Sequence, residues 1–310
     1  MYDLSILIVN WNTRELLRQC LLSASGTGCS LKLETVVVDN NSSDHSAEMV
    51  LREFPTVRLI RNEVNLGFAK ACNQAMRAAT GRYLLLLNSD TQILEGALDA
   101  MCRYMDENEQ VAAVGCTLLS SDGSVQRSYW NRFPSVRDAL IENLYLYRLS
   151  HQRQYPREGN TAGSSPTEEA IDVCHLLGAC VMLRREAVAD VGLFDEGYFM
   201  YLEETDWFYR AKRKGWRVCH LPSVRVIHHG QQSSQLDPVR VIPHLSKSYC
   251  RFVRKHYGGG STGAIKAIYA CGAVIRVLLW TKRRLAGPDR RLAGRMLSAY
   301  GAVVREICRA

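Results

Sequence analysis

Short apolar runs that alternate with amphipathic segments constrain the fold of this chain more than any other feature. Residues 4–9, 33–38, 57–60, 83–87 and 111–114 are apolar and are predicted to be strands, whereas residues 67–79 and 94–105 show helical spacing. Another helix is predicted after Asn12, which would cap it, with Glu15 three residues later. Strands that are apolar throughout are typical of a parallel sheet covered on both faces. The pattern therefore predicts a doubly wound, mostly parallel α/β fold.

After residue 120 the sequence pattern changes, first to a polar, irregular stretch and then back to regular patterning. Residues 120–169 are polar and irregular, which predicts a mobile cover or an insertion. Regular patterning returns over residues 173–183, 194–215 and 224–228, and the chain is helical and basic from residue 236 onward.

Charge is unevenly distributed along the 310 residues. The net charge is +8, but residues 236–310 hold 15 Lys and Arg against 3 Asp and Glu, a balance of +12, so residues 1–235 carry −4. Such a tail predicts a surface for an anionic partner: phospholipid headgroups, a phosphorylated lipid or nucleic acid. A nucleic-acid-binding body is disfavoured, because the acidic part of the chain offers neither a basic groove nor a recognised motif.

The N-terminus and the cysteines indicate the compartment. The apolar run from Leu4 is too short for a signal peptide and lacks a basic flank, so a cytoplasmic protein is expected. The eleven cysteines are scattered and include no Cys-x-x-Cys pair, so neither a disulfide framework nor a zinc site is predicted.

Polar residues follow two of the predicted strands. Asp39 ends one apolar run and can accept hydrogen bonds from a nucleobase or a ribose, and Asp90 follows another and suits Mg²⁺ or Mn²⁺. Between them, Gly67 allows close approach of an anion to a helix N-terminus. Ligands of open parallel sheets bind at this edge. Each feature taken alone also fits an ordinary turn or helix start.

A block of five acids interleaved with aromatic residues runs from Asp195 to Asp206. Asp206 and Arg210 are four apart on a predicted helix, so they can form a structural ion pair. Glu203 or Glu204 is the candidate general base, because partial burial among aromatic rings raises the pKa of a carboxyl. Further on, a strand ends in His228 and His229, of which one is a metal ligand or both are structural.

These segments, in this order, resemble the family 2 glycosyltransferases, which have the nucleotide-diphospho-sugar transferase (GT-A) fold. The resemblance rests on residues 8–12, 38–44 and 65–68, on Asn88-Ser89-Asp90, on Gly178-Ala179, and on residues 194–207 with Arg210 and Gly215-Trp216 behind them. It covers roughly the first 235 residues. It implies a nucleotide-sugar-binding half over residues 1–120, an acceptor-binding half over residues 121–235, and a basic helical extension over residues 236–310.

The resemblance also implies roles. The donor nucleotide sugar would be bound by Val9, Asn10, Asn12, Asp39, Asn65, Gly67, Asn88 and Ser89. The acceptor would be bound by Gly178, Asp195, Glu196, Glu203 and Asp206. Asp90 and His228 would hold Mg²⁺ or Mn²⁺, and Glu204 would be the catalytic base of a single displacement with inversion. Asn88 replaces the first acid of the family's Asp-x-Asp motif, so one carboxylate of that motif remains for the metal.

A narrower likeness is to bacterial rhamnosyltransferases that use dTDP-L-rhamnose to build surface polysaccharides. A glycan or a polyprenyl-diphosphate-linked acceptor is then expected, with assembly into a homo-oligomer left open. The alternatives are a UDP-hexose or UDP-galactofuranose donor, or a catalytically silent protein that binds sugar nucleotides. The presence of Asp39, Asp90 and Glu204 favours an active enzyme.

The tail contains an apolar stretch over residues 264–280 that includes Lys266 and Arg276 and precedes Lys282, Arg283 and Arg284. It is predicted to be too short and too charged to span a bilayer. An amphipathic helix in the headgroup plane, with Trp280 at its edge, fits the pattern, and so does a packed helical appendage with a solvated basic face. The first alternative implies peripheral attachment to the inner face of the cytoplasmic membrane.

Overall fold

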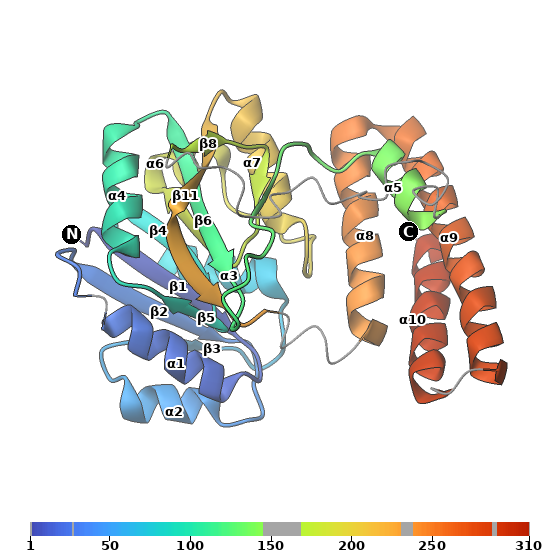
Figure 1. Cartoon of the computed structure of the whole chain (residues 1–310), viewed down its shortest axis with the longest axis horizontal. Helices are drawn as coiled ribbons and strands as arrows, with labels where there is room; N and C mark the ends of the chain where they lie inside the picture. Colours follow the sequence, from blue (N-terminus) through green and yellow to red (C-terminus); the bar gives the residue numbers. More distant parts are fainter. Residues whose placement is uncertain (1, 27, 145–168, 231–237, 287–289, 310) are drawn as a thin grey trace. The chain divides into compact units, whose positions relative to one another are not determined.

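The computed structural model describes residues 2–26, 28–144, 169–230, 238–286 and 290–309. These residues form two compact units. The first unit contains a large sheet with its covering helices, and the second contains four helices (Figure 1).

Among the described residues, the first unit is built on a nine-stranded sheet whose main path has the order β3-β2-β1-β4-β10-β6-β11-β5, with β8 paired to β11. Its strands are β1 (Leu4–Asn10), β2 (Leu33–Asp39), β3 (Arg58–Arg61), β4 (Tyr83–Asn88), β5 (Thr91–Ile93), β6 (Val111–Leu119), β8 (Ile171–Asp172), β10 (Cys180–Arg184) and β11 (Arg217–His228). A separate pair joins β7 (Tyr129–Trp130) to β9 (His175–Leu176).

Strands β1 to β4 pair in parallel, as expected from their continuous apolar runs. Strand β10 runs antiparallel to both of its neighbours, β4 and β6, and β11 continues parallel to β6. The mostly parallel α/β class is therefore confirmed. The reversed β10 could not be read from its residues, because a strand buried on both faces is apolar in either direction.

Helices cover the sheet of the first unit. They are α1 (Arg14–Ser25), α2 (Ser46–Glu53), α3 (Phe68–Ala78), α4 (Ala97–Glu107), α6 (Arg185–Val191) and α7 (Glu203–Arg213). Leu4, Ile6 and Ile8 of β1 share one buried cluster with side chains of α1, α2 and α4. Side chains alternate along a strand, so the intervening residues face the other side, where α3 contacts β1 and β2.

The expected cap of the first helix is wrong. The cap position of α1 is Thr13, whereas Asn12 lies in the left-handed region with a φ of 55°. The first backbone N–H of the helix, that of Arg14, donates instead to Asp44 Oδ2 at 2.8 Å. A carboxylate from another loop thus occupies the place that a local side chain usually takes.

The second unit consists of α5 (Val136–Asn143), α8 (Pro238–Tyr257), α9 (Gly259–Ala286) and α10 (Arg290–Arg309). Its interior includes Tyr249, Phe252, Ile265, Tyr269 and Val303. The basic helices begin at Pro238, whereas α5 comes from the stretch assigned by sequence to a cover and packs against α9 in the same unit.

Arg276 explains why α5 belongs to this unit. Its guanidinium donates to the backbone oxygens of Asn143 at 2.9 Å and Glu142 at 3.3 Å, which lie in the last turn of α5. Gly272 permits the close approach, since a Cβ there would lie 2.8 Å from the Cβ of Asn143. Arg276 therefore stabilises packing within the unit.

The stretch around Trp280 is longer than its sequence pattern indicated. The helix begins at Gly259, and residues Gly259–Leu285 are long and apolar enough to cross a membrane by length and composition alone, with a mean hydropathy of 1.6 over the 18-residue window that qualifies. The prediction that the stretch is too short and too charged is wrong on this criterion, because the helix extends five residues further toward the N-terminus. Most of its apolar window is not buried within the protein.

Candidate active site

The ends of several strands meet at one edge of the sheet in the first unit. In the parallel pairs, Asn10 lies opposite Asp39 and Val9 opposite Asn88. Because β10 is antiparallel, its beginning lies at the same edge, and Asn88 N–H donates to the Ala179 carbonyl at 2.9 Å. The edge therefore gathers residues that the sequence separates widely.

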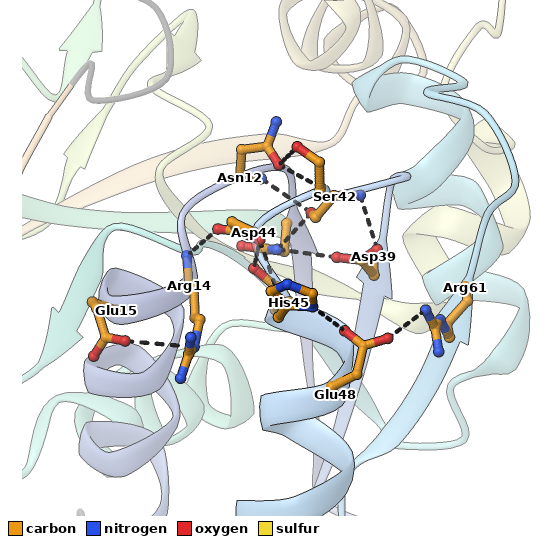
Figure 2. Close-up of polar contacts among 12 residues, drawn as sticks. Asn12, Arg14, Glu15, Asp39, Ser42, Asp44, His45, Glu48 and Arg61 are labelled. Atoms are coloured by element: carbon orange, nitrogen blue, oxygen red, sulfur yellow. Dashed lines mark hydrogen bonds and ion pairs between the residues drawn. The ribbon is translucent and has the colours of Figure 1, made fainter.

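Asp39 is buried and held on both carboxyl oxygens. Asn10 Nδ2 donates to Oδ1 at 3.2 Å, and the Ser42 N–H donates to Oδ2 at 3.1 Å. The Ser42 hydroxyl in turn accepts from Asn10 Nδ2 and from the Asn12 N–H. Figure 2 shows this network, in which Asn12 and Ser42 lie over the end of the strand that carries Asp39. The carboxylate is thus fixed in direction while lone pairs remain for a ligand.

The polar edge continues to the turn after β4. The Thr13 hydroxyl donates to Asn10 Oδ1 at 2.7 Å and lies 2.8 Å from the buried Ser89 hydroxyl. Asn10 and Ser89, both expected at the donor site, are therefore linked through a residue that sequence analysis did not select. A network that is satisfied throughout holds its members rigidly.

Asn40 organises the segment before α3. Its Oδ1 accepts from the Leu66 N–H at 3.0 Å, and its Nδ2 donates to Asn65 Oδ1 at 3.0 Å and to the Gly67 carbonyl at 3.3 Å. Asn65 also accepts from the Gly67 N–H at 2.9 Å. The sequence identified Asn65 and Gly67, but Asn40 joins them to the end of β2.

Gly67 is required by its surroundings as well as by its backbone. Its φ is 85°, and a Cβ there would lie 2.5 Å from the Phe199 carbonyl oxygen. The next residue, Phe68, donates its N–H to that oxygen at 2.6 Å. The turn expected at the donor site is thus attached to the acidic block of the sequence.

Asp90 and His228 face each other, as expected for a shared metal site. His228 Nε2 lies 3.4 Å from Asp90 Oδ1, and both side chains are nearly buried. The other ring nitrogen, Nδ1, lies 2.8 Å from Gln126 Oε1, while Gln126 Nε2 donates to the His228 carbonyl at 2.7 Å. The second bond fixes the amide so that Oε1 accepts from Nδ1–H. Nε2 is then the ring nitrogen that faces the carboxylate.

A ring nitrogen and a carboxylate oxygen that face each other can share a divalent metal, and they can also form an ion pair when the ring is protonated. No group of three or more His, Cys, Asp or Glu residues suited to a metal occurs in the described parts of the chain. Mg²⁺ is commonly held by one or two protein ligands together with substrate phosphates and water. Gln126, which the sequence did not reveal, is the outer residue that orients the ring. His229 is turned away, with Nδ1 2.8 Å from the Ser121 hydroxyl.

Glu203 and Glu204 occupy the first turn of α7. Glu203 is 3% exposed, and Glu204 is half-buried beside Gly178, where a Cβ would lie 3.4 Å from Glu204 Oε1. Burial raises the pKa of both carboxyls, that of Glu203 well above its ordinary value. Gly178 follows β9 and precedes Ala179, so the pair lies near the end of β4.

Asp206 has a different place from the one expected. It is fully buried, accepts from Arg210 Nε at 2.9 Å, and so contradicts direct contact with an acceptor. Arg210 also donates to the carbonyls of Val191 and Leu193 at 2.7 and 2.8 Å. The structural ion pair is therefore the correct interpretation, and it anchors the loop before the acidic block.

The two earlier acids lie at the surface end of this block. Asp195 Oδ1 accepts from the Gly197 N–H at 2.9 Å, forming a tight turn. Glu196 is exposed and pairs with Arg77 at 3.0 Å and Asn73 at 3.0 Å, which hold the pKa of its carboxyl below the ordinary value. Asn73 of α3 also exchanges two hydrogen bonds with the Phe194 backbone, so it fixes the block to α3.

Comparison with known proteins assigns this arrangement to a family. The model of glycosyl transferase family 2 matches residues 5–192, more than half of the chain. The chain belongs to this family. As a family 2 glycosyltransferase it is an enzyme, and its likeness to rhamnosyltransferases is confirmed by a relative. That relative, N-acetylglucosaminyl-diphospho-decaprenol L-rhamnosyltransferase of Mycobacterium tuberculosis, is 28% identical over 240 residues, which span 73% of this chain and 76% of the relative.

Solved structures confirm the GT-A fold of this glycosyltransferase. A mannosyltransferase of Pyrobaculum calidifontis, determined with GDP-Man and Mn²⁺, superposes with a TM-score of 0.56 at 17% identity, over 99% of this chain and 86% of that one. GalNAc-T7, determined with UDP, GalNAc and Mn²⁺, gives 0.61 at 16% identity over 100% of this chain and 56% of that one. At these identities the likeness concerns the fold.

Proposed function

We propose that this family 2 glycosyltransferase transfers L-rhamnose from dTDP-L-rhamnose, with inversion, to a glycan or a polyprenyl-diphosphate-linked acceptor. The observation that carries the proposal is the gathering of Asp39, the Asp90–His228 pair and Glu204 around the strand-end edge of one unit. The relative in Mycobacterium tuberculosis, named for L-rhamnose transfer to a decaprenyl-linked sugar, supports the choice of donor and acceptor.

Asp39 and its neighbours would bind the nucleotide. The Asp39 carboxylate, held by Asn10 and Ser42, is oriented to accept hydrogen bonds from the base or the ribose. Asn65 and Gly67 shape the turn at the start of α3, and a helix N-terminus favours a phosphate. Val9, Asn12, Asn88 and Ser89 complete the donor set at the same edge.

Asp90 and His228 would hold the divalent metal. When bound, the metal would neutralise the diphosphate charge that develops as the leaving group departs. The protein prepares the site by orienting His228 through Gln126 and by keeping both ligands nearly dry.

Glu204 would be the general base. The pKa of the Glu204 carboxyl is raised, which makes this carboxylate a stronger base. Glu204 lies beside Gly178, at the acceptor side of the expected site. Asp195 and Glu196 would shape the acceptor end from the loop fixed by Asn73.

Donor binding tests the metal and the nucleotide together. Thermal unfolding should shift upward with dTDP-L-rhamnose plus Mn²⁺, because a ligand well above its Kd stabilises the folded state by a few kcal/mol. Asp90→Ala should remove the Mn²⁺-dependent part of the shift, whereas Glu63→Ala, at an exposed acid of the same unit, should keep it. Full transfer in excess EDTA would contradict the metal site.

The same panel decides among donors. A shift with UDP-hexose or UDP-galactofuranose but not with dTDP compounds would replace rhamnose as the donor. Binding without transfer to any lipid-linked or glycan acceptor would favour a protein that binds sugar nucleotides without catalysis.

The second unit provides the surface for attachment to a membrane. Its described helices expose Val274, Leu278, Leu279 and Leu285 beside a run of bases that includes Lys282, Arg283 and Arg284. Apolar side chains next to bases fit an anionic lipid interface. We accordingly propose a cytoplasmic enzyme on the inner face of the membrane, near a lipid-linked acceptor.

A further inference from the structure

Glu203, which is buried, and Glu204, which is half-buried, are adjacent in α7, and neither has a basic partner among the described residues. No salt bridge links either carboxyl to a Lys, Arg or His in the part of the chain that the structure describes. Each also keeps one buried carboxyl oxygen, Oε2, with no hydrogen bond there. Two carboxylates in such a place repel each other, so the pair favours a state in which one of the two holds a proton.

The surrounding groups do not supply a compensating charge. On α3, the buried Cys72 thiol is neutral, because burial and the two glutamates raise its pKa well above the ordinary value. One turn along α7, Asp206 is already paired with Arg210. From the β9–β10 connection, Gly178 contributes only its backbone N–H to Glu204. The proton must therefore reside on one of the two glutamates.

The two carboxyls differ in how well their ionised forms are stabilised. Burial raises the pKa of Glu204, whereas polar contacts with the backbone of Gly178 and Thr205 and with the Glu203 carboxyl lower it. Glu203 is 3% exposed, and both burial and the charge of Glu204 raise its pKa. The negative charge consequently belongs on Glu204 and the proton on Glu203.

We propose that Glu203 is a positioning residue, a neutral carboxylic acid that donates a hydrogen bond to the Glu204 carboxylate and aims its free lone pair at the acceptor hydroxyl. The proposal rests on the proposed function of Glu204 as base. This role replaces the expected contact of Glu203 with the acceptor, because a side chain that is only 3% exposed has little surface for such a contact.

The proton balance of transfer is then simple. The acceptor oxygen bonds to the anomeric carbon of the donor, the bond from that carbon to the diphosphate oxygen breaks, and the hydroxyl proton passes to Glu204. Glu203 keeps its own proton throughout. A neutral donor at position 203 should therefore serve as well as the acid itself.

Glu203→Gln and Glu203→Leu separate this role from a merely structural one. Glutamine keeps a neutral donor, so kcat should stay within about threefold of wild type with an unchanged pH profile. Leucine removes the donor that stabilises ionised Glu204, so the acid limb of the kcat profile should move to higher pH and kcat should fall about tenfold or more, with the KM for donor unchanged. Loss of turnover in Glu203→Gln would overturn the proposal.

A measurement without substrate keeps the test independent of the proposed function. Infrared spectra of the full chain near pH 7 should show a protonated carboxyl C=O band that is absent in Glu203→Gln and present in Glu204→Gln. If the band is missing from wild type, or is lost in Glu204→Gln and kept in Glu203→Gln, Glu203 is not the proton holder. If no donor supports transfer but the band behaves as expected, the proposed function fails while the proton assignment stands.

Discussion

Individual polar residues of the site depend on partners that hold them in one orientation. His228 takes its tautomer from Gln126, Asp39 is aimed by Asn10 and Ser42, and Asn40 joins two loops with one amide. Because these partners hold the side chains in place, little reorganisation is needed when a ligand binds.

His175 is held in place by aromatic neighbours, and its burial makes the stability of the fold depend on pH. Its ring is 7% exposed, stacks on Trp130 with centroids 4.7 Å apart, and lies 5.8 Å from the ring of Phe133. Burial lowers its pKa to about 3, below the ordinary value of 6.5. As the pH falls below about 6.5, His175 binds a proton in the unfolded chain but stays neutral in the folded chain. The unfolding free energy therefore decreases as the pH drops below about 6.5.

We expect His175→Phe to remove this acid sensitivity while keeping the aromatic stack. Between pH 6.5 and 5, wild type should lose about 1.5 kcal/mol more unfolding free energy than the variant. Chemical denaturation at the two pH values measures the difference. His45→Asn, at an exposed position whose left-handed φ of 64° suits asparagine, should keep the wild-type dependence. Equal slopes in His175→Phe and wild type would show that His175 is protonated in the fold.

At the scale of elements, the direction of each strand determines what meets at the active edge. β1, β2 and β4 end there and β10 begins there, so Gly178 and the acids of α7 come close to the turn after β4. The start of α3 is coupled to the acidic block by the contact of Gly67 and Phe68 with the Phe199 carbonyl.

Two glycines at helix starts provide a matched test of this coupling. Gly67 precedes α3 with φ 85° and ψ 168°, a region essentially restricted to glycine, and its missing Cβ leaves room for Phe199. Gly96 precedes α4 with φ 75° and ψ −9°, and nothing lies within 4 Å of the place of its Cβ.

Gly67→Ala should therefore lower the unfolding free energy by about 2–4 kcal/mol and weaken donor binding, because backbone strain and a steric clash add. Gly96→Ala should cost about 1 kcal/mol through the backbone alone and leave donor binding intact. Denaturation curves and donor titrations measure both effects. Similar losses in the two variants would mean that the Phe199 contact contributes nothing specific.

For the whole molecule, net charge divides between the two units. The acidic first unit carries the candidate active site, and the basic second unit carries the exposed leucines of α9. Under the proposed function, sugar-nucleotide chemistry would belong to the first unit and membrane attachment to the second.

We expect the full chain to bind vesicles that contain an anionic phospholipid and to be released by salt, since each Lys or Arg near such a surface contributes about 1 kcal/mol. Leu278→Glu with Leu279→Glu, at side chains 66% and 48% exposed, should weaken binding at least tenfold in co-sedimentation. The matched pair Leu22→Glu with Leu51→Glu, equally exposed on the first unit, should have no effect. If both double variants bind vesicles as well as wild type does, α9 is not the part of the chain that contacts the membrane.

Local sequence determined the strands β1 to β4, the helices α3 and α4 and the mostly parallel sheet class, because side-chain periodicity and turn residues act over a few neighbours. Ordered motifs at strand ends were sufficient to identify the family, and the family model confirms it. The site roles carried over from that resemblance stay predictions, apart from Asp206, whose burial contradicts acceptor contact.

Only the tertiary structure decided the features that depend on distant partners. The reversed direction of β10, the tautomer of His228 set by Gln126 from 102 residues away, and the use of Arg276 to hold α5 leave no local pattern. The same holds for Asp44, which caps α1 in place of Asn12. Hydrogen-bond partners and strand neighbours are chosen by packing of the whole unit, and an apolar run or a polar residue looks alike whichever partner it finds.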